Sequence, residues 1–153
     1  MHVVPERVMP SHWGMSPAQS VRAECGRRGR DAVVAGCIGL LGGEGADDEL
    51  LLALAGPAAE YVLAGGEGGP AGYWPRVWAA RGLLHAWEDV AAPAIILATT
   101  DESWRVREMA AKVIAKHHVG DALQAVAALA DDAVPRVRAA AGRAVMILSA
   151  SGD

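Results

Sequence analysis

Aromatic residues and cysteines are scarce in this chain. It has no phenylalanine, aromatic residues make up 5% of its 153 residues, and its two cysteines are Cys25 and Cys37. Two cysteines cannot form a disulfide framework, nor by themselves a four-ligand zinc site. No apolar run reaches the ~20 residues that a membrane helix needs, and residues 1–15 lack the apolar core of a signal peptide. We therefore expect a soluble cytoplasmic protein that does not bind a membrane.

Positive charge is not in excess either. The chain carries 14 Lys and Arg against 18 Asp and Glu, which gives a formal net charge of −4. Dedicated nucleic-acid-binding domains usually have a pI above ~9, so the composition does not favour that class. With 52% apolar and 21% charged residues, the chain has enough apolar material to fold around a core, and wholesale disorder is excluded.

The motifs of catalytic and metal sites are missing as well. The sequence has no H-x-x-x-H pair and no G-x-S-x-G, and no glycine-rich segment carries the Lys-Ser/Thr of a phosphate-binding loop. His117 and His118 are adjacent, and neighbouring helical side chains point about 100° apart, so these two do not form a chelate. We predict no catalytic residue, no metal and no cofactor, and therefore a protein that is not an enzyme.

Cys25 is the candidate nucleophile that needs separate consideration. Arg27, Arg28 and Arg30 follow it closely, and nearby cations stabilise a thiolate. Free cysteine more commonly behaves as a small buried hydrophobic residue. We favour that structural role for both Cys25 and Cys37.

An internal repeat occupies the second half of the chain. The segment that begins Asp101-Glu-Ser-Trp-Arg-Val-Arg matches the segment that begins Asp132-Ala-Val-Pro-Arg-Val-Arg at an offset of 31. One unit upstream, Trp74-Pro-Arg-Val aligns at an offset of 29, which matches Arg76 to Arg105. Each unit contains two patterns of apolar residues at three- and four-residue spacing, which predict two helices. A hairpin of ~30 residues cannot bury its apolar face alone, so neighbouring units must stack.

Capping residues and glycines predict the helix boundaries. In the first half we expect four helices, at residues 17–28, 32–41, 48–55 and 58–63. Ser16, Asp31 and Asp47 are the predicted N-caps, and glycines close these helices. In the second half, Ser103 and Asp121 are the predicted N-caps.

These expectations divide the chain into four parts. They are an N-terminal arm at 1–15, a helical region at 16–71, the repeats at 72–150 and a tail at 151–153. Terminal units of an array are atypical because one face meets water, so residues 16–71 are either degenerate repeats or a cap. Within the repeats, the residues predicted to be buried include Val106, Val113, Val137 and Leu148.

The Asp-x-x-x-Arg-Val-Arg pattern, which opens an alanine-rich helix about every 30 residues, resembles the HEAT repeat. It is most similar to the short HEAT-like repeats of phycobilisome lyases, and the resemblance covers residues 72–150. The resemblance implies an all-α fold, a right-handed α-solenoid or α–α superhelix, with about nine helices in this chain. The first unit departs from the family pattern because Gly72 and Trp78 stand where Asp101 and Arg107 stand in the next unit. The Asp/Arg pair that the family uses between repeats is thus expected to be absent there.

Two sets of residues are candidate functional positions. Tryptophan and arginine dominate interaction hot spots, and both occur on consecutive units; the partner-binding candidates are Trp74, Trp78, Arg81, Trp104 and Arg105. The alternative for these tryptophans is that they fill gaps between alanine-rich helices. The second set is predicted to pair between adjacent repeats in a structural role: Asp101, Arg107, Asp132 and Arg138.

The leading functional hypothesis is a non-catalytic interaction module, a scaffold or adaptor that docks a protein partner on its helical surface, as HEAT-like repeats commonly do. One alternative is nucleic-acid binding, since some HEAT-like solenoids, including alkylpurine DNA glycosylases, grip DNA with Arg, Lys and Trp. Against it, residues 72–153 carry nine Lys and Arg and as many Asp and Glu. The other alternative, implied by the phycobilisome-lyase resemblance, is a lyase-type or accessory enzyme subunit.

Overall fold

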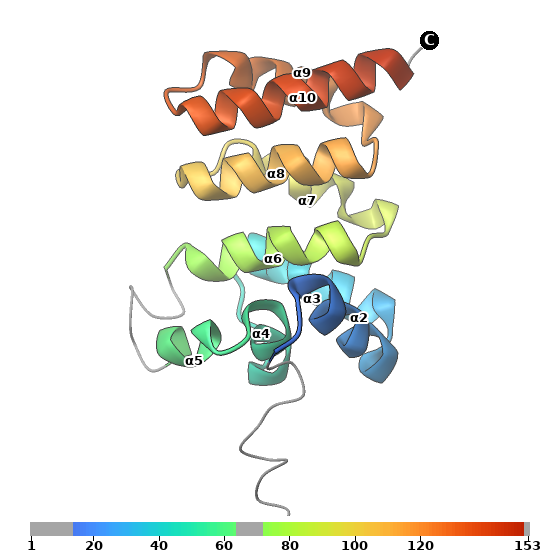
Figure 1. Cartoon of the computed structure of the whole chain (residues 1–153), viewed down its shortest axis with the longest axis vertical. Helices are drawn as coiled ribbons and strands as arrows, with labels where there is room; N and C mark the ends of the chain where they lie inside the picture. The colour runs from blue at the N-terminus through green and yellow to red at the C-terminus, as the bar shows by residue number, and fades with distance from the viewer. Residues whose placement is uncertain (1–13, 64–71, 152–153) are drawn as a thin grey trace, which may run out of the picture.

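The described part of the chain is entirely helical. A computed structural model describes residues 14–63 and 72–151, and within them it contains nine α-helices, three short 3-10 helices and no strand (Figure 1). The predicted all-α class is confirmed. The arm at 1–15, the glycine-rich segment 64–71 and the tail at 151–153 fall almost wholly outside the described residues. No described helix is both long and apolar enough to cross a bilayer.

The first half consists of four helices whose ends agree with the predicted ones. They are α2 (Pro17–Arg28), α3 (Arg30–Leu41), α4 (Asp48–Ala55) and α5 (Ala58–Leu63). Ser16 forms the predicted capping box with Gln19, and the Asp47 carboxylate accepts the Leu50 N–H at 2.7 Å. The start of α3 is the exception: α3 begins at Arg30, two residues before the predicted start at Ala32, so Asp31 lies inside its first turn and is not its N-cap.

The second half alternates long and short helices. The long ones are α6 (Trp74–His85), α8 (Trp104–Lys116) and α10 (Pro135–Ser151). The short ones are α7 (Ala92–Ala98) and α9 (Leu123–Ala128), with 3-10 turns η2 (Asp89–Ala91), η3 (Gly120–Ala122) and η4 (Leu129–Asp131). Figure 1 shows α6, α8 and α10 lying one above another across the molecule. Asp121 is not an N-cap, because it lies inside η3 and α9 begins only at Leu123.

One core runs through both halves. The residues predicted to be buried are buried: Val106, Val113 and Val137 are 0% exposed and Leu148 is 7% exposed. Helix α6 packs on α2, α3 and α4 on one side and on α8 on the other, so it joins the two halves. The continuous core holds the long helices rigidly in place, and their N-terminal ends carry most of the candidate site residues.

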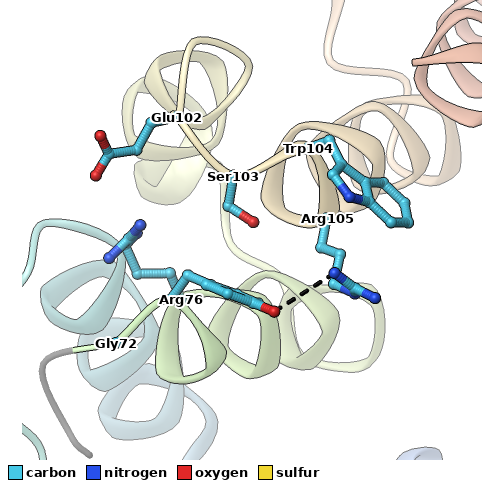
Figure 2. A pocket seen from close by; sticks show the side chains of 7 residues that line it. Gly72, Arg76, Glu102, Ser103, Trp104 and Arg105 are labelled. Carbon is cyan, nitrogen blue, oxygen red and sulfur yellow. Dashed lines mark hydrogen bonds between the residues drawn. The ribbon is translucent and has the colours of Figure 1, made fainter. Parts of the chain in front are cut away.

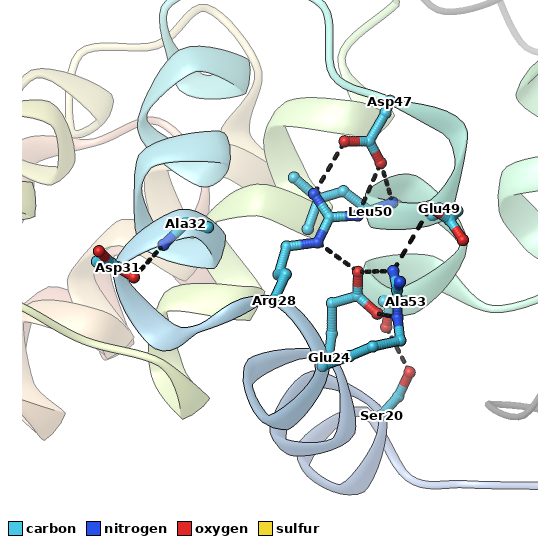
Figure 3. Close-up of polar contacts among 10 residues, drawn as sticks. Ser20, Glu24, Arg28, Asp31, Ala32, Asp47, Glu49, Leu50 and Ala53 are labelled. Atoms are coloured by element: carbon cyan, nitrogen blue, oxygen red, sulfur yellow. Dashed lines mark hydrogen bonds and ion pairs between the residues drawn. The ribbon is translucent and has the colours of Figure 1, made fainter.

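A polar network fastens α2 to α4 (Figure 3). Glu24 is buried on α2 and binds the guanidinium of Arg28, which also forms two hydrogen bonds of 2.8 and 2.9 Å to Asp47 at the start of α4. These hydrogen bonds from Arg28, with that from a backbone N–H, lower the pKa of Asp47 to about 2. The Ser20 hydroxyl donates to the Ala53 carbonyl at 2.6 Å. The acidic residues at this helix start thus have a structural role.

We predict that Gly82→Ala destabilises the fold and that Gly142→Ala does not. A Cβ atom on Gly82 of α6 would lie 2.6 Å from the Cδ2 atom of Leu54 and 3.2 Å from the Cys37 sulfur, and both neighbours are buried. Such overpacking costs about 1–3 kcal/mol of unfolding free energy. A Cβ atom on Gly142 of α10 meets nothing within 4 Å, so alanine there gains about 0.5–1 kcal/mol of helix propensity.

Urea unfolding of the two variants beside the wild type measures both effects. A Gly82→Ala variant as stable as the wild type would contradict the described packing of α6 on α3 and α4.

Candidate functional site

A cation among aromatic rings lies where α6 and α8 begin. The side chains of Tyr73, Trp74, Trp104 and Arg105, which we call the arginine–aromatic cluster, come from the starts of these two neighbouring helices. The Cζ atom of Arg105 lies 4.6 Å from the ring centroid of Trp104, 5.4 Å from that of Trp74 and 5.9 Å from that of Tyr73. Its Nη1 also donates to the Tyr73 hydroxyl at 3.4 Å. The aromatic faces therefore hold the guanidinium in a defined position.

Arg105 has no carboxylate partner among the described residues. Its one hydrogen bond there is the long one to Tyr73, and its other contacts are with aromatic faces. A guanidinium has five N–H donors, so most of its donors remain available. An arginine that is fixed in place and has free donors is prepared to bind a carboxylate from outside the chain.

A surface hollow of about 470 Å³ adjoins the cluster (Figure 2). Its lining is formed by Gly72, Tyr73, Arg76, Glu102, Ser103, Trp104 and Arg105. The guanidinium of Arg76 is committed to Asp101 at 2.7 Å, which leaves Arg105 as the lining cation without a carboxylate. Ser103 is the N-cap residue of α8, as predicted, but its hydroxyl makes no capping hydrogen bond. The hollow thus combines a cation, aromatic rings and a hydroxyl.

Two of the predicted partner-binding residues lie apart from this cluster's surface, one buried and one half-buried. Trp78 is only 5% exposed and stacks beneath Trp74 with ring centroids 6.3 Å apart, so it fills a gap and supports the cluster. Arg81 donates to the Leu54 carbonyl at 2.7 Å, and burial lowers the pKa of its guanidinium. The placement of Trp78 on the binding surface was wrong, because its side chain is buried. Arg81 lines a separate hollow beside Pro57, and its role in binding stays a prediction. Trp74, Trp104 and Arg105 are half-exposed and lie together.

The sequence interpretation missed two members of this surface, Tyr73 and Arg136. The Cζ atom of Arg136, at the start of α10, lies 5.3 Å from the ring centroid of Trp104. Both could have been found by aligning the first unit at an offset of 31. Tyr73 is then equivalent to Trp104. Trp74, Arg105 and Arg136 are then equivalent to one another. The surface is therefore a column of equivalent positions at the starts of three successive long helices.

Two identical ion pairs connect the successive units. Arg76 binds Asp101, and Arg107 binds Asp132; in each pair the two hydrogen bonds measure 2.7 and 3.2 Å, and the residues are 25 apart. Each aspartate also accepts the backbone N–H two residues further on. Arg107 therefore reaches the aspartate of the following unit, as an inter-repeat residue should. Arg138 instead donates to the backbone carbonyl of Asp132 in its own unit, so the predicted pairing of Arg138 between repeats is not formed within the described residues.

The ion pairs correct the alignment of the first unit. Because Arg76 pairs as Arg107 does, these two arginines are equivalent, and the offset is 31, where the sequence interpretation had 29. The first unit therefore does possess the pairing arginine. Trp78 does not stand in its place.

The remaining candidate side chains have structural surroundings. Burial raises the pKa of the Cys37 thiol to about 12, and partial burial likewise raises that of Cys25, so neither thiol is activated. His117 stacks on Trp87 with centroids 4.7 Å apart, its Nε2 lies 2.7 Å from the Leu83 carbonyl, and burial lowers its pKa. No group of three or more His, Cys, Asp or Glu in the described residues is arranged to hold a metal.

We predict that Asp132→Asn destabilises the protein by about 1–3 kcal/mol at pH 7, because Asp132 accepts charge-assisted hydrogen bonds from Arg107. These hydrogen bonds lower the pKa of Asp132 below its ordinary value. The stabilisation is therefore complete above the pKa of an unfolded aspartate, about 3.9, and is lost as the pH falls through the lower folded value.

The measurement is urea unfolding of the wild type and the variant between pH 7 and pH 3. The difference in unfolding free energy should shrink below about pH 4. Asp131→Asn is the matched control, since Asp131 is exposed and adjacent. A penalty for Asp132→Asn that does not change with pH would contradict the ion pair as the source of the stabilisation.

Comparisons with protein-family models, with curated proteins and with solved structures found no match for this chain. The interpretation of the site therefore depends on the chain's own residues and their geometry. The combination to be explained is an arginine held among aromatic rings at the junction of two helices, beside a hollow and with donors available.

Proposed function

We propose that the chain is a short right-handed α-solenoid of HEAT-like units that acts as a non-catalytic protein-docking module. The stacking of α6, α8 and α10 and the recurrence of one ion pair between successive units support the solenoid. The observation that carries the docking function is Arg105, which is held by three aromatic rings and lacks a carboxylate partner in the described chain.

The arginine–aromatic cluster has the chemistry of a binding hot spot. Trp, Tyr and Arg are the residues most enriched at such positions, where truncation of one side chain costs about 2 kcal/mol or more. The rings already fix the Arg105 side chain, so binding loses little conformational entropy. The partner that fits is a protein segment with a carboxylate for the guanidinium and an apolar side chain for the exposed faces of Trp74 and Trp104.

Nucleic acid is the second candidate, because bases stack on aromatic rings and arginines bind phosphates. Arg136, with its side chain 67% exposed beside Trp104, is the observation in its favour. Two carboxylates oppose it: Glu102 lines the hollow, and Glu108 binds Arg136 at 3.1 Å. They reduce the positive potential that a run of phosphates requires, whereas a protein segment needs to place only one carboxylate, at Arg105. We therefore place protein first.

The test places a photo-cross-linking amino acid at position 102 of the tagged full chain, where exposed Glu102 lines the hollow and Arg105 is kept, in lysate of the source cells, with and without nuclease. We expect a discrete protein adduct that survives nuclease and does not form when the cross-linker replaces Arg22, which is exposed on α2. Quantitative capture with the unmodified chain should fall at least about tenfold for Arg105→Glu and for Trp104→Ala.

Trp87→Ala and Arg22→Glu are the matched controls, because they make comparable changes away from the cluster and should leave capture unchanged. Thermal unfolding shows whether each variant remains folded. Adducts that disappear with nuclease, together with binding that weakens steeply between about 50 and 200 mM salt, would overturn the protein-docking proposal in favour of nucleic acid.

A further inference from the structure

The outer side of α10 occupies the position, 31 residues further on, of the surface with which α8 receives α10. On α8, Glu108, Ala111 and Ala115 lie on one face at three- and four-residue spacing, and Glu108 binds Arg136 of α10. Glu108 and Ala111 are buried and Ala115 is half-buried, so this face is covered by the next unit.

The equivalent face of α10 is exposed. At the offset of 31, its positions are Ala139, Gly142 and Met146; all three are exposed, Met146 by 72%. Arg138 is equivalent to Arg107 and has no carboxylate partner among the described residues, where it donates only to a backbone carbonyl. The face therefore offers a stripe of small residues, an exposed methionine and an arginine in the position that binds aspartate on α8.

We propose that this face of α10 docks a helix of another polypeptide that is preceded by an aspartate, in the way that α8 docks α10. The internal precedent defines the ligand: Asp132 stands three residues before the first residue of α10, Pro135, and binds Arg107 while α10 covers the small residues of α8. A partner helix with an aspartate at that distance reaches Arg138, and its apolar face covers Gly142 and Met146. The proposal depends on α8 and α10 alone, and not on the arginine–aromatic cluster.

A second copy of the chain does not fit this face. Three aspartates that precede described helices are bound by arginines: Asp47 by Arg28, Asp101 by Arg76 and Asp132 by Arg107. Asp89, three residues before α7, accepts the Trp87 indole N–H at 3.1 Å, and α7 already packs on α3 and α8. Two α10 helices packed antiparallel about their centres would also place like charges together, because Arg143 is the middle residue of Pro135–Ser151. The observations therefore favour a partner of different sequence.

The probe is a synthetic peptide with the sequence of residues 119–151, which carries α9, Asp132 and α10. Calorimetric titration of the full chain with this peptide should show binding that weakens at least about tenfold for the Arg138→Glu chain and for the Met146→Glu chain. Arg22→Glu is the matched charge reversal and should leave binding within about twofold. A peptide with Asp132→Arg should recover affinity for the Arg138→Glu chain, since the charges are then exchanged.

Three results would overturn the proposal. The first is no binding at about 100 µM peptide. The second is binding that Arg138→Glu leaves unchanged, since that would show the peptide displacing the chain's own α9 and α10 from α8. The third is sedimentation of the chain as a dimer that Met146→Glu dissociates, which would make a second copy the occupant. None of these results affects capture through the arginine–aromatic cluster, so the two proposals fail separately.

Discussion

The paired hydrogen bonds between the arginine of one unit and the aspartate of the next are the interaction on which the rest of the structure depends. Arg76 and Asp101 form them with the same atoms and lengths as Arg107 and Asp132. Both aspartates are largely shielded from water, 12% and 7% exposed, where a charge-assisted pair is stronger than on an open surface. The pairs join the start of one long helix to the start of the next, and this alignment brings the arginine–aromatic cluster together.

Small residues between the long helices explain where the aromatic side chains lie. Ala79, Ala110 and Ala141 occupy equivalent positions in α6, α8 and α10, and each is fully buried. Alanines at these buried positions let the long helices approach closely and leave little room for the large area of an indole ring. Of the tryptophans in the described residues, Trp74, Trp87 and Trp104 therefore lie partly buried at helix ends, and Trp78 is the buried exception. The three partly buried rings remain accessible from the surface.

Residue patterns that act within a few positions predicted the helices correctly. Matching identical short segments did not give the correct alignment of the first unit with the later ones. Helix class, most boundaries and the buried valines follow from spacing, capping and glycine, which act within a few residues. The offset of the first unit was wrong because Arg76-Val77 was matched by identity to a later Arg-Val. In the fold, Pro75 occupies the buried position of Val106, and only the burial pattern and the ion pair show it. The misplacement of Trp78 on the surface has a related cause, because the sequence does not show which face of α6 its neighbours cover.

The Arg-Val-Arg motif explains why the units stack in one direction. Side chains two residues apart on a helix point roughly 200° apart, so the two arginines face opposite neighbours while the valine between them enters the core. Arg105 reaches back to the aromatic rings of α6, and Arg107 reaches forward to Asp132. In α10, Arg136 reaches back to α8, and Arg138 has no following unit within the described chain. Arg105 and Arg136 thus contact the preceding long helix through cation–π interactions, to which Arg136 adds an ion pair with Glu108. Arg76 and Arg107 contact the following unit through hydrogen-bonded ion pairs. The two sides of α8 consequently differ in chemistry: the side toward the preceding helix carries cation–π contacts, and the side toward the following unit carries the arginine that binds aspartate.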